Sequence, residues 1–473
     1  MRLLFSDAPP QALAAIRDLC DAHLHQDLRS PAAWAWLDGR LTRRLIVGDT
    51  NVISRLHDTV ARHRRRVSSA EPTLGLVARP DADELTNKLR ESDQTVTILD
   101  GKAGAGKSAV VAQVVAELEA EGWFVAIATM DGTHRATTTS RQLGEAADLD
   151  DSPALLLSAV SDGAPALLVV EQLDAVSVYG GRMTDNFEAV SELVDEAARS
   201  KSVRILLVVR TVDLAGDPRL RDLITEDVGR HTVGLLDRER VRQHLDDYEL
   251  DIPDDKTLEL LRTPLHLSVF AHLSPAARAQ HHRSLQELYE RYTEEVRQSI
   301  ESEVGGLDWA GIITPLVEFM SEHERLVAPP AVVDHADRRQ LRALESAAVL
   351  IRDGSGLRFF HESYFDYLFA RAFVGAGRDV HEFLADSGQY LFRRAQTRQL
   401  LEFLAGTDSE RFRATVVELL GSDQIRTHLK GVVVSVLRAH DAVEADWLAL
   451  EDLAWSGAPT AAKVLNLLSS PQW

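Results

Sequence analysis

The chain has 473 residues, which is too many for one hydrophobic core, and we expect roughly three or four domains. Hydrophobic residues make up 45% and charged residues 26%, as in ordinary globular proteins, and no stretch approaches the ~20 apolar residues that would span a bilayer. The formal net charge of −21 argues against a general nucleic-acid-binding surface, because long-range electrostatics would repel a polyanion.

Cysteine usage and the first residues bear on the compartment. Cys20 is the only cysteine in the sequence, which excludes an internal disulfide framework and a multi-thiolate zinc site and suits a reducing environment. Residues 1–11 lack a basic segment followed by an apolar core and a small-residue cleavage site, so no secretory signal is visible. We therefore expect a cytoplasmic protein.

The N-terminal region, residues 1–75, has helical spacing of its apolar residues and a local charge that differs from the rest of the chain. Its first seventy residues hold eleven arginines and seven aspartates, a balance of +4. An arginine cluster at residues 62–66 favours a solvated helix face or a docking site for an acidic neighbouring domain, with nucleic-acid contact as the alternative. A linker rich in Ser, Glu and Pro is expected at 68–73.

A glycine-rich loop lies between an apolar run at 95–99 and an amphipathic helix at 109–118. Residues 101–108 read Gly-Lys-Ala-Gly-Ala-Gly-Lys-Ser and fit the pattern G-x-x-x-x-G-K-[ST]. The glycines of such a loop let backbone N–H groups surround a phosphate without steric conflict, and we expect this of Gly101, Gly104 and Gly106. A strand-to-helix turn that matches by chance is the alternative, but the flanking strand and helix favour phosphate binding.

The last two residues of this loop supply charge and a metal ligand. The ammonium of Lys107 would reach the β- and γ-phosphates of ATP, and the hydroxyl of Ser108 would bind Mg²⁺. The helix that begins there points its positive end at the anion. ATP or ADP with Mg²⁺ is therefore the expected ligand.

From residue 95 to about 236, apolar β-type runs alternate with helical stretches. This pattern predicts an α/β nucleotide-binding domain, residues 76–237, with a parallel sheet covered on both faces. Its ligand should bind beyond the carboxyl ends of the strands. The strands that we expect span residues 95–99, 123–129, 166–170, 203–209 and 231–235.

Polar side chains follow two of these strands. The third strand ends in Glu171, with Asp174 shortly after it, where a carboxylate would hold Mg²⁺ beside the phosphates. The fourth strand ends in Arg210, a cation placed to neutralise a γ-phosphate. Strand ends are often polar without any function, but the phosphate loop favours the functional interpretation.

Beyond residue 238 the β-type runs stop and helices dominate. Residues 238–305 read as a helical lid, in which Pro264 stands near a helix start. In residues 306–376, two helices and a β-hairpin with its turn at Asp353-Gly354 suggest a winged helix. Residues 377–473 read as short helices in pairs, like the start of a solenoid, without a repeat strict enough to name.

The order of these parts resembles the NACHT-like branch of the STAND family, signal-transducing P-loop ATPases that act as nucleotide-controlled switches. The resemblance covers residues 76–374. Its most specific piece is 357–371, Leu-Arg-Phe-Phe-His-Glu-Ser-Tyr-Phe-Asp-Tyr-Leu-Phe-Ala-Arg, which is similar to the winged-helix signature of that family.

This resemblance implies roles for four residues. His361 would reach the β-phosphate of bound ADP, and Pro264 would pack on the adenine. The segment of Arg79 would close over the base, and Arg210 matches the sensor arginine of the family. Without the resemblance, His361 reads as a solvated or core-capping histidine in the N-terminal turn of a helix.

One departure from the family pattern concerns hydrolysis. The strand before the expected metal site normally ends in an Asp, a small residue, and acids at the third and fourth positions after the Asp. Here Glu171 replaces the Asp, Gln172 replaces the small residue, and Asp174 is the one acid that remains, followed by Ala175. We therefore expect slow ATP hydrolysis, with Lys107, Glu171, Asp174 and Arg210 as its catalytic residues.

Two functions from different classes are compatible with these motifs. The first is a regulatory switch, as in bacterial defence or signalling, which ADP keeps closed and ATP allows to form a homo-oligomer after a ligand binds the C-terminal helices. The second is a continuously cycling AAA+-type ATPase that remodels a protein substrate. A cycling motor would want an acid directly after Glu171, where Gln172 stands, so the switch is preferred.

Overall fold

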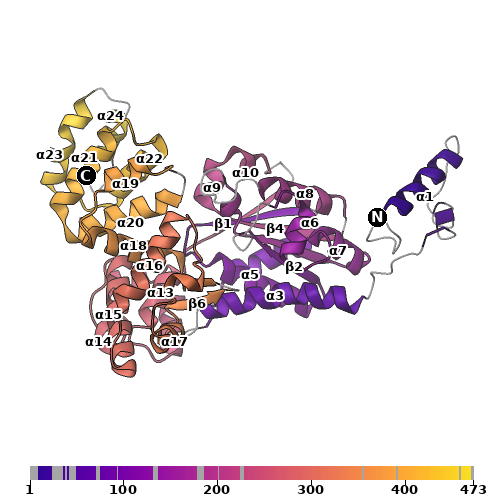
Figure 1. The fold of residues 1–473 in the computed structure, drawn as a ribbon, viewed down its shortest axis with the longest axis horizontal. Helices are drawn as coiled ribbons and strands as arrows, with labels where there is room; N and C mark the ends of the chain where they lie inside the picture. Colours follow the sequence, from indigo (N-terminus) through magenta and orange to yellow (C-terminus); the bar gives the residue numbers. More distant parts are fainter. Residues whose placement is uncertain are drawn as a thin grey trace. The chain divides into compact units, whose positions relative to one another are not determined.

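The computed structural model describes residues 9–23, 33, 36–37, 40–41, 49–70, 75–92, 94–130, 137–177, 186–200, 202–223, 228–353, 356–389, 392–456, 460–469 and 473 (Figure 1). The chain divides into two compact units. The first comprises Met1–Val67, Ala78–Ser177 and Met183–Gly234, and the second comprises Ser68–Val77, Val178–Arg182 and Leu235–Trp473.

The first unit is built on a parallel sheet with the strand order β2-β3-β4-β1-β5. The described strands are β1 (Val96–Gly101), β2 (Phe124–Thr129), β3 (Ala166–Glu171), β4 (Val203–Arg210) and β5 (Gly229–Val233). Each expected strand is present, which confirms the α/β prediction. The fifth was placed two residues too late, because its first half, Gly-Arg-His, carries no apolar signal.

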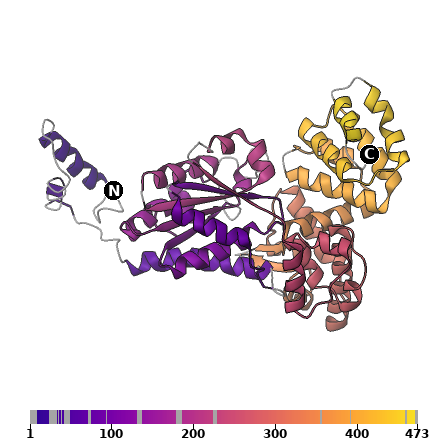
Figure 2. The same cartoon turned by 180° about the vertical axis from the view of Figure 1, so that it is seen from behind.

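Helices cover both faces of this sheet (Figure 2). The apolar side chains along the strands alternate between the two faces. Leu168 and Val170 of β3 pack on one face, whereas Leu167 and Val169 pack on the other. The first face is covered mainly by α6 (Ser140–Ala146), α7 (Pro153–Ser161) and α8 (Phe187–Ala198), and the second by α4 (Pro80–Glu91) and α5 (Lys107–Ala120). Shorter helices follow the strand ends: η1 (Leu173–Val176), α9 (Thr211–Gly216) and α10 (Pro218–Asp222).

An additional helix, α3 (Thr50–Ala70), packs along the sheet at its β2 edge, and α1 (Pro9–Ala22) precedes it. The hydroxyl of Thr59 accepts a hydrogen bond of 3.0 Å from the backbone N–H of Ile127 in β2. Helix α3 also includes residues 68–70, so the linker predicted at 68–73 was wrong there. Residues 71–73 of the predicted linker lie outside the described part of the chain.

The arginines of α3 contact acidic residues of the same unit. Arg62 pairs with Asp148 at 2.8 Å, and Arg64 pairs with Glu119. These contacts favour the docking interpretation of the basic cluster over nucleic-acid binding.

The second unit is helical apart from a two-stranded antiparallel sheet of β6 (Leu350–Asp353) and β7 (Gly356–Phe359), which confirms the predicted hairpin. Gly354 of the predicted turn lies outside the described residues. The helices before the hairpin are α11 (Arg238–Asp247), α12 (Asp255–Leu260), α13 (Pro264–Ala271), α14 (Pro275–Arg278), α15 (Leu285–Val304), α16 (Trp309–Glu322), η3 (Pro330–Val333) and α17 (Arg338–Ser346).

Further helices follow the hairpin to the end of the chain, and one hydrophobic core runs through the unit from Leu236 to Leu467. Among the described residues, no helix is long and apolar enough to cross a membrane. The helices after the hairpin are α18 (Glu362–Gly375), α19 (Val380–Asp386), α20 (Phe392–Thr407), α21 (Ser409–Gly421), α22 (Thr427–Ala439), α23 (Glu444–Trp455), α24 (Ala461–Leu465) and η4 (Asn466–Ser469).

Candidate functional site

The glycine-rich loop joins the central strand β1 to helix α5. Gly104 and Gly106 have φ angles of 73° and 86°, in the left-handed region that residues with a Cβ rarely adopt. Gly106 is the N-cap of α5 and has no side chain to satisfy the first-turn N–H groups. These donors and the helix dipole are therefore available to an anion at the carboxyl end of β1.

Lys107 lies where four other charged side chains converge. Its ammonium donates hydrogen bonds to the carbonyl oxygens of Gly101 and Lys102, at 3.1 and 3.0 Å. Burial and the charge of Arg210 lower its pKa to about 8, although Asp174, Glu171 and Asp100 act in the opposite direction. The lysine is thus held over the loop, in surroundings that favour an added negative charge.

Glu171 ends β3 and is 1% exposed. Burial raises its pKa, but the charge and hydrogen bonding of His63, the charge of Arg66 and a hydrogen bond from Ser108 together lower it, which keeps the carboxylate ionised. Its Oε1 atom is buried without a hydrogen-bond partner among the described residues. A charged carboxylate with an unpartnered oxygen beside a serine hydroxyl fits a hard cation such as Mg²⁺.

A glycine-rich loop thus links the central strand of a doubly covered parallel sheet to a helix, with an acidic residue at the end of a neighbouring strand. The first unit has the P-loop NTPase fold.

Two further predicted site residues of this P-loop unit contact each other. Arg210, at the end of β4, lies with its Nε atom 3.2 Å from the Oδ2 atom of Asp174 in η1. Between β3 and η1, Gln172 has a φ of 58°, which is uncommon for a residue other than glycine. Its Oε1 atom is buried without a hydrogen bond in the described part of the chain. Strain and unsatisfied polar atoms of this kind concentrate at functional sites.

Asp100, which the sequence did not single out, braces the same end of the sheet. Its fully buried carboxylate accepts hydrogen bonds from Arg230 at 2.9 and 3.0 Å and from the hydroxyls of Thr211 and Thr232 at 2.8 Å each. Burial raises the pKa of Asp100, but the hydrogen bonds of these three residues and the charge of Arg230 lower it. The one signal in the sequence that could have identified Asp100 is its position, a charged residue at the end of an apolar strand, directly before the first glycine of the loop.

Arg79 is 3% exposed and caps the start of α4 with its backbone. Its guanidinium donates to the carbonyls of Ala105 and Gly234, at 3.1 and 2.7 Å, and to the carboxylate of Asp81. Burial raises the pKa of Asp81, but hydrogen bonds from His231 and Arg79 lower it well below its usual range. The side chain of Arg79 thus ties the phosphate loop to the residue after β5, while the role of its segment at the base stays a prediction.

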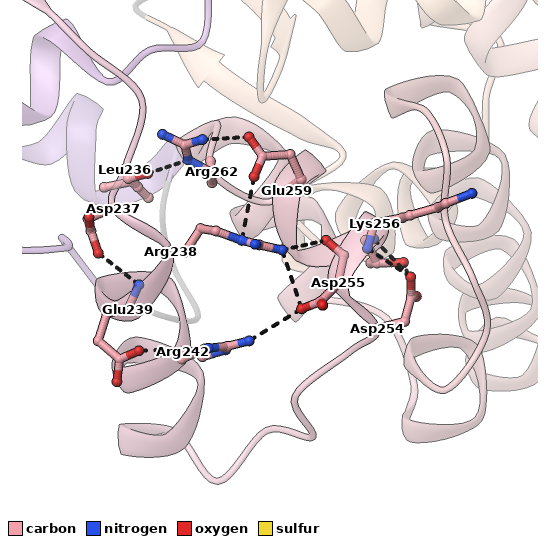
Figure 3. Close-up of polar contacts among 11 residues, drawn as sticks. Leu236, Asp237, Arg238, Glu239, Arg242, Asp254, Asp255, Lys256, Glu259 and Arg262 are labelled. Carbon is pink, nitrogen blue, oxygen red and sulfur yellow. Dashed lines mark hydrogen bonds and ion pairs between the residues drawn. The ribbon is translucent and has the colours of Figure 1, made fainter.

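Pro264 and His361 belong to the second unit and are described within it. Pro264 is the first residue of α13, as predicted. Just before it, Arg262 accepts a bond from the N–H of Leu236 with its carbonyl, at 2.8 Å, and donates to the Leu236 carbonyl with Nε, at 2.9 Å. Figure 3 shows Arg262 beside an ion-pair cluster in which Arg238 contacts Asp255. The start of α13 is therefore fixed to the chain that leads into α11.

His361 is the N-cap of α18. Its Nδ1 atom accepts a hydrogen bond of 3.1 Å from the backbone N–H of Ser363, and the Ser363 hydroxyl lies 2.7 Å from the same atom. Because Nδ1 acts as an acceptor, the neutral ring carries its proton on Nε2. The capping role corresponds to the simpler interpretation of His361, and its role at ADP stays a prediction.

No family model and no curated protein matches the chain. A Walker-type ATPase of Pyrococcus abyssi is similar in structure, with 13% identity over 62% of this chain and 95% of that chain and a TM-score of 0.34. A STAND protein of Pyrococcus horikoshii with a tetratricopeptide repeat sensor has 11% identity over 85% of this chain and 59% of that chain, with a TM-score of 0.33. The AMPPCP-bound DnaA of Aquifex aeolicus has 15% identity over 68% of this chain and 93% of that chain, with a TM-score of 0.33. These matches assign no function to this chain.

Proposed function

We propose that the chain is an ATP-binding molecular switch of the STAND class, in its NACHT-like branch. The observation that carries the proposal is the convergence of Lys107, Asp174, Glu171 and Arg210 at the carboxyl end of the sheet, beside the glycine-rich loop. Burial and two cations beside a phosphate loop are what a triphosphate requires. The charged residues arise from four different elements, α5, β3, η1 and β4, so the site forms only in the folded chain.

Each of these groups would have a separate task at the nucleotide. The loop N–H groups and Lys107 would bind the phosphates, and Ser108 with Glu171 would hold Mg²⁺. The metal would neutralise charge on the phosphates. Arg210, paired with Asp174 in this structure, would exchange that carboxylate for the γ-phosphate, because a multiply charged phosphate is the stronger acceptor.

Slow hydrolysis fits this arrangement. Gln172 has no group that could take the proton of an attacking water, and Asp174 becomes available for this task only when Arg210 leaves it for the phosphate. We therefore expect turnover below the ~1 s⁻¹ that marks the lower end of ordinary enzymes.

The second unit would provide the switch. Residues 238–305 would form a lid with Pro264 at the adenine, and 306–376 a winged helix. The bridge between Ala328 and Leu357, which adds an antiparallel contact to the β6–β7 hairpin, supports the winged-helix proposal. His361 would contact ADP in a closed state, and residues 377–473 would receive a ligand or protein that opens it. The open, ATP-bound chain would assemble with copies of itself.

Two measurements test the proposal. Light scattering after size exclusion should give a larger mass with ATP than with ADP, and the Lys107→Ala variant should show no such difference. An identical mass with both nucleotides, together with rapid turnover in the absence of any partner, would instead favour the cycling ATPase.

Hydrolysis offers a second, residue-level test. Asp174→Asn should lower steady-state turnover severalfold while ATP affinity stays within about twofold, because binding depends on other groups. The matched control is Asp195→Asn, which changes an exposed aspartate of α8. Equal effects of the two variants would exclude a role for Asp174 in hydrolysis.

A further inference from the structure

Helix α3 is part of the nucleotide-binding unit, although it precedes the phosphate loop by some thirty residues of sequence. Its apolar side chains belong to both hydrophobic clusters of the sheet: Val52 and Leu56 to one, and Val60 to the other. The Thr59 hydroxyl accepts from Ile127 on the edge strand. The helix is thus held against the sheet, and its next turn lies at the carboxyl end, where Glu171 of β3 pairs with Thr129 of β2.

The next turn carries His63 to Glu171. The Nδ1 atom of His63 lies 3.2 Å from the Oε2 atom of the glutamate, and both side chains are 2% exposed. Arg66, one turn further along α3, adds its positive charge to the surroundings of the same carboxylate. Three polar groups from two helices therefore act on Glu171: His63 and Arg66 from α3, and Ser108 from α5.

A packing role does not account for this contact. Burying a charged or polar group is costly unless a partner compensates it, and an apolar side chain would fill the space under α3 without that cost. His63 instead places two polar atoms in the interior: Nδ1 meets Glu171 at 3.2 Å without the geometry of a hydrogen bond, and Nε2 has no hydrogen-bond partner among the described residues. The contact leaves Oε1 of Glu171 unpartnered while Oε2 is held. An oriented carboxylate with one oxygen to spare is what a metal ligand needs.

We propose that His63 is a positioning residue, which orients Glu171 toward Mg²⁺ and thereby couples the docking of helix α3 to the binding of the magnesium–nucleotide complex. This inference rests on the proposed function, since it requires Glu171 to be a metal ligand. Coupling between two binding events is reciprocal, so a partner that pulls α3 from the β2 edge would weaken Mg²⁺–ATP binding. Conversely, Mg²⁺–ATP would hold α3 in place. The docking of helix α3, and with it the N-terminal region, would then depend directly on whether Mg²⁺–ATP is bound.

The first test measures ATP affinity with Mg²⁺ and with EDTA in the full chain. His63→Leu, which keeps the volume and removes the polar contact, should lose about tenfold of the Mg²⁺-dependent gain, as is usual when the partner of a metal ligand is removed. Affinity in EDTA should not change. His63→Gln, whose amide N–H can still donate to Glu171, should recover most of the gain. The matched control is His57→Leu, since His57 is an exposed histidine on the same helix.

The second test follows α3 itself by amide hydrogen exchange. Mg²⁺–ATP should slow exchange across residues 51–67 in the wild type by severalfold more than ATP with EDTA does, and this difference should vanish in His63→Leu. Thr59→Val tests the same coupling without changing the surroundings of Glu171, because it removes the hydroxyl that accepts from the Ile127 N–H. It should speed exchange in α3 and weaken Mg²⁺–ATP binding.

The outcomes separate this inference from the proposed function. If the wild type does not bind ATP, or Lys107→Ala binds it equally well, the proposed function is wrong. If those two behave as expected but His63→Leu keeps both the full Mg²⁺ dependence and the exchange difference, the coupling through His63 is wrong. An equal loss in His63→Gln and His63→Leu would likewise overturn it, because the donor would then have no role.

Discussion

Buried oxygen atoms occur in both units, but their hydrogen bonding differs between the P-loop site and the tyrosine cluster of the second unit. At the carboxyl end of the P-loop sheet, Glu171 and Gln172 each bury an oxygen without a hydrogen bond among the described residues. In the second unit, buried tyrosine hydroxyls have partners: Tyr289 contacts Ser363 at 2.7 Å, and Tyr364 contacts Thr293 at 3.0 Å. The two oxygens at the P-loop can accept a ligand, whereas these tyrosine hydroxyls are satisfied within the scaffold. Buried side-chain nitrogens without a hydrogen bond among the described residues, such as Nε2 of His428, occur in the second unit as well, so a missing partner does not by itself mark a site.

The largest effect is expected at the phosphate loop. Lys107→Ala should weaken ATP binding by about a hundredfold or more, because charge-assisted hydrogen bonds are worth roughly 1.5 to 3 kcal/mol each and the ammonium would make several of them. Isothermal titration calorimetry measures the loss. The matched control is Lys102→Ala, an exposed lysine in the same loop. Wild-type affinity in Lys107→Ala would place the phosphates elsewhere.

His361 already has a hydrogen-bond partner within the second unit, and its variants test whether it also contacts bound ADP. His361→Ala should weaken ADP binding by about ten- to a hundredfold and ATP binding less, since only the closed state would make the contact. The same change removes the cap of α18 and costs about 1 kcal/mol of stability. His361→Asn keeps a capping side chain but is too short to replace the imidazole.

The two His361 variants therefore separate capping from nucleotide contact. A similar loss of ADP affinity in both indicates the contact. A loss in the alanine variant alone, with wild-type affinity in the asparagine variant, would mean that His361 is a cap and that the closed-state contact does not exist.

The pH dependence of ATP binding tests the role of one residue of the P-loop site, Lys107. Lys107 has a lowered pKa of about 8, so above that pH the free protein must take up a proton to present an ammonium to the phosphates. Affinity should therefore be highest below pH 8 and about tenfold weaker at pH 9 than at pH 7. Lys107→Arg stays charged over this range, and a decline of the same size in that variant would assign the titration to another group.

The sign for folding is the opposite. Burial disfavours the charged lysine in the folded chain, so between pH 8 and its ordinary pKa of 10.5 the unfolded chain binds more protons. The contribution of Lys107 to stability is unfavourable below pH 8 and diminishes as pH rises through this window.

The smallest effect is expected in the scaffold. Tyr364→Phe removes the buried contact with Thr293 and should lower the free energy of unfolding by about 1 kcal/mol, without changing ATP affinity. Urea denaturation and calorimetry measure the two quantities. A change in ATP affinity comparable to that of the site variants would abolish the distinction between scaffold and site.

The sheet and the phosphate loop could be predicted because their signals are local. Buried parallel strands read as short apolar runs, and the loop motif fixes the order strand, loop, helix. The structure places Glu171 and Arg210 at strand ends, as predicted, while their role at a ligand stays a prediction from the rule that ligands bind at that edge. The pairing of Arg210 with Asp174 depends on two strands separated by more than thirty residues and had no local signal.

His63 and Asp100 were missed for the same reason. His63 stands in a sequence rich in arginine and histidine, where nothing distinguishes a buried side chain from exposed neighbours. Its partner lies more than a hundred residues away. The linker at 68–73 was misplaced because Ser-Ser-Ala after a long helix resembles the start of a loop, but these residues add a last turn to α3.

Helix α3 has a practical consequence for anyone who trims this chain. A fragment that begins at residue 76 would appear to contain the whole ATP-binding sheet, yet it would leave the Ile127 N–H of the β2 edge without the Thr59 hydroxyl and uncover apolar side chains beneath Val52 and Leu56. Open strand edges pair with other chains. Such a fragment should aggregate on expression, and supplying residues 49–70 as a separate peptide should keep it in solution.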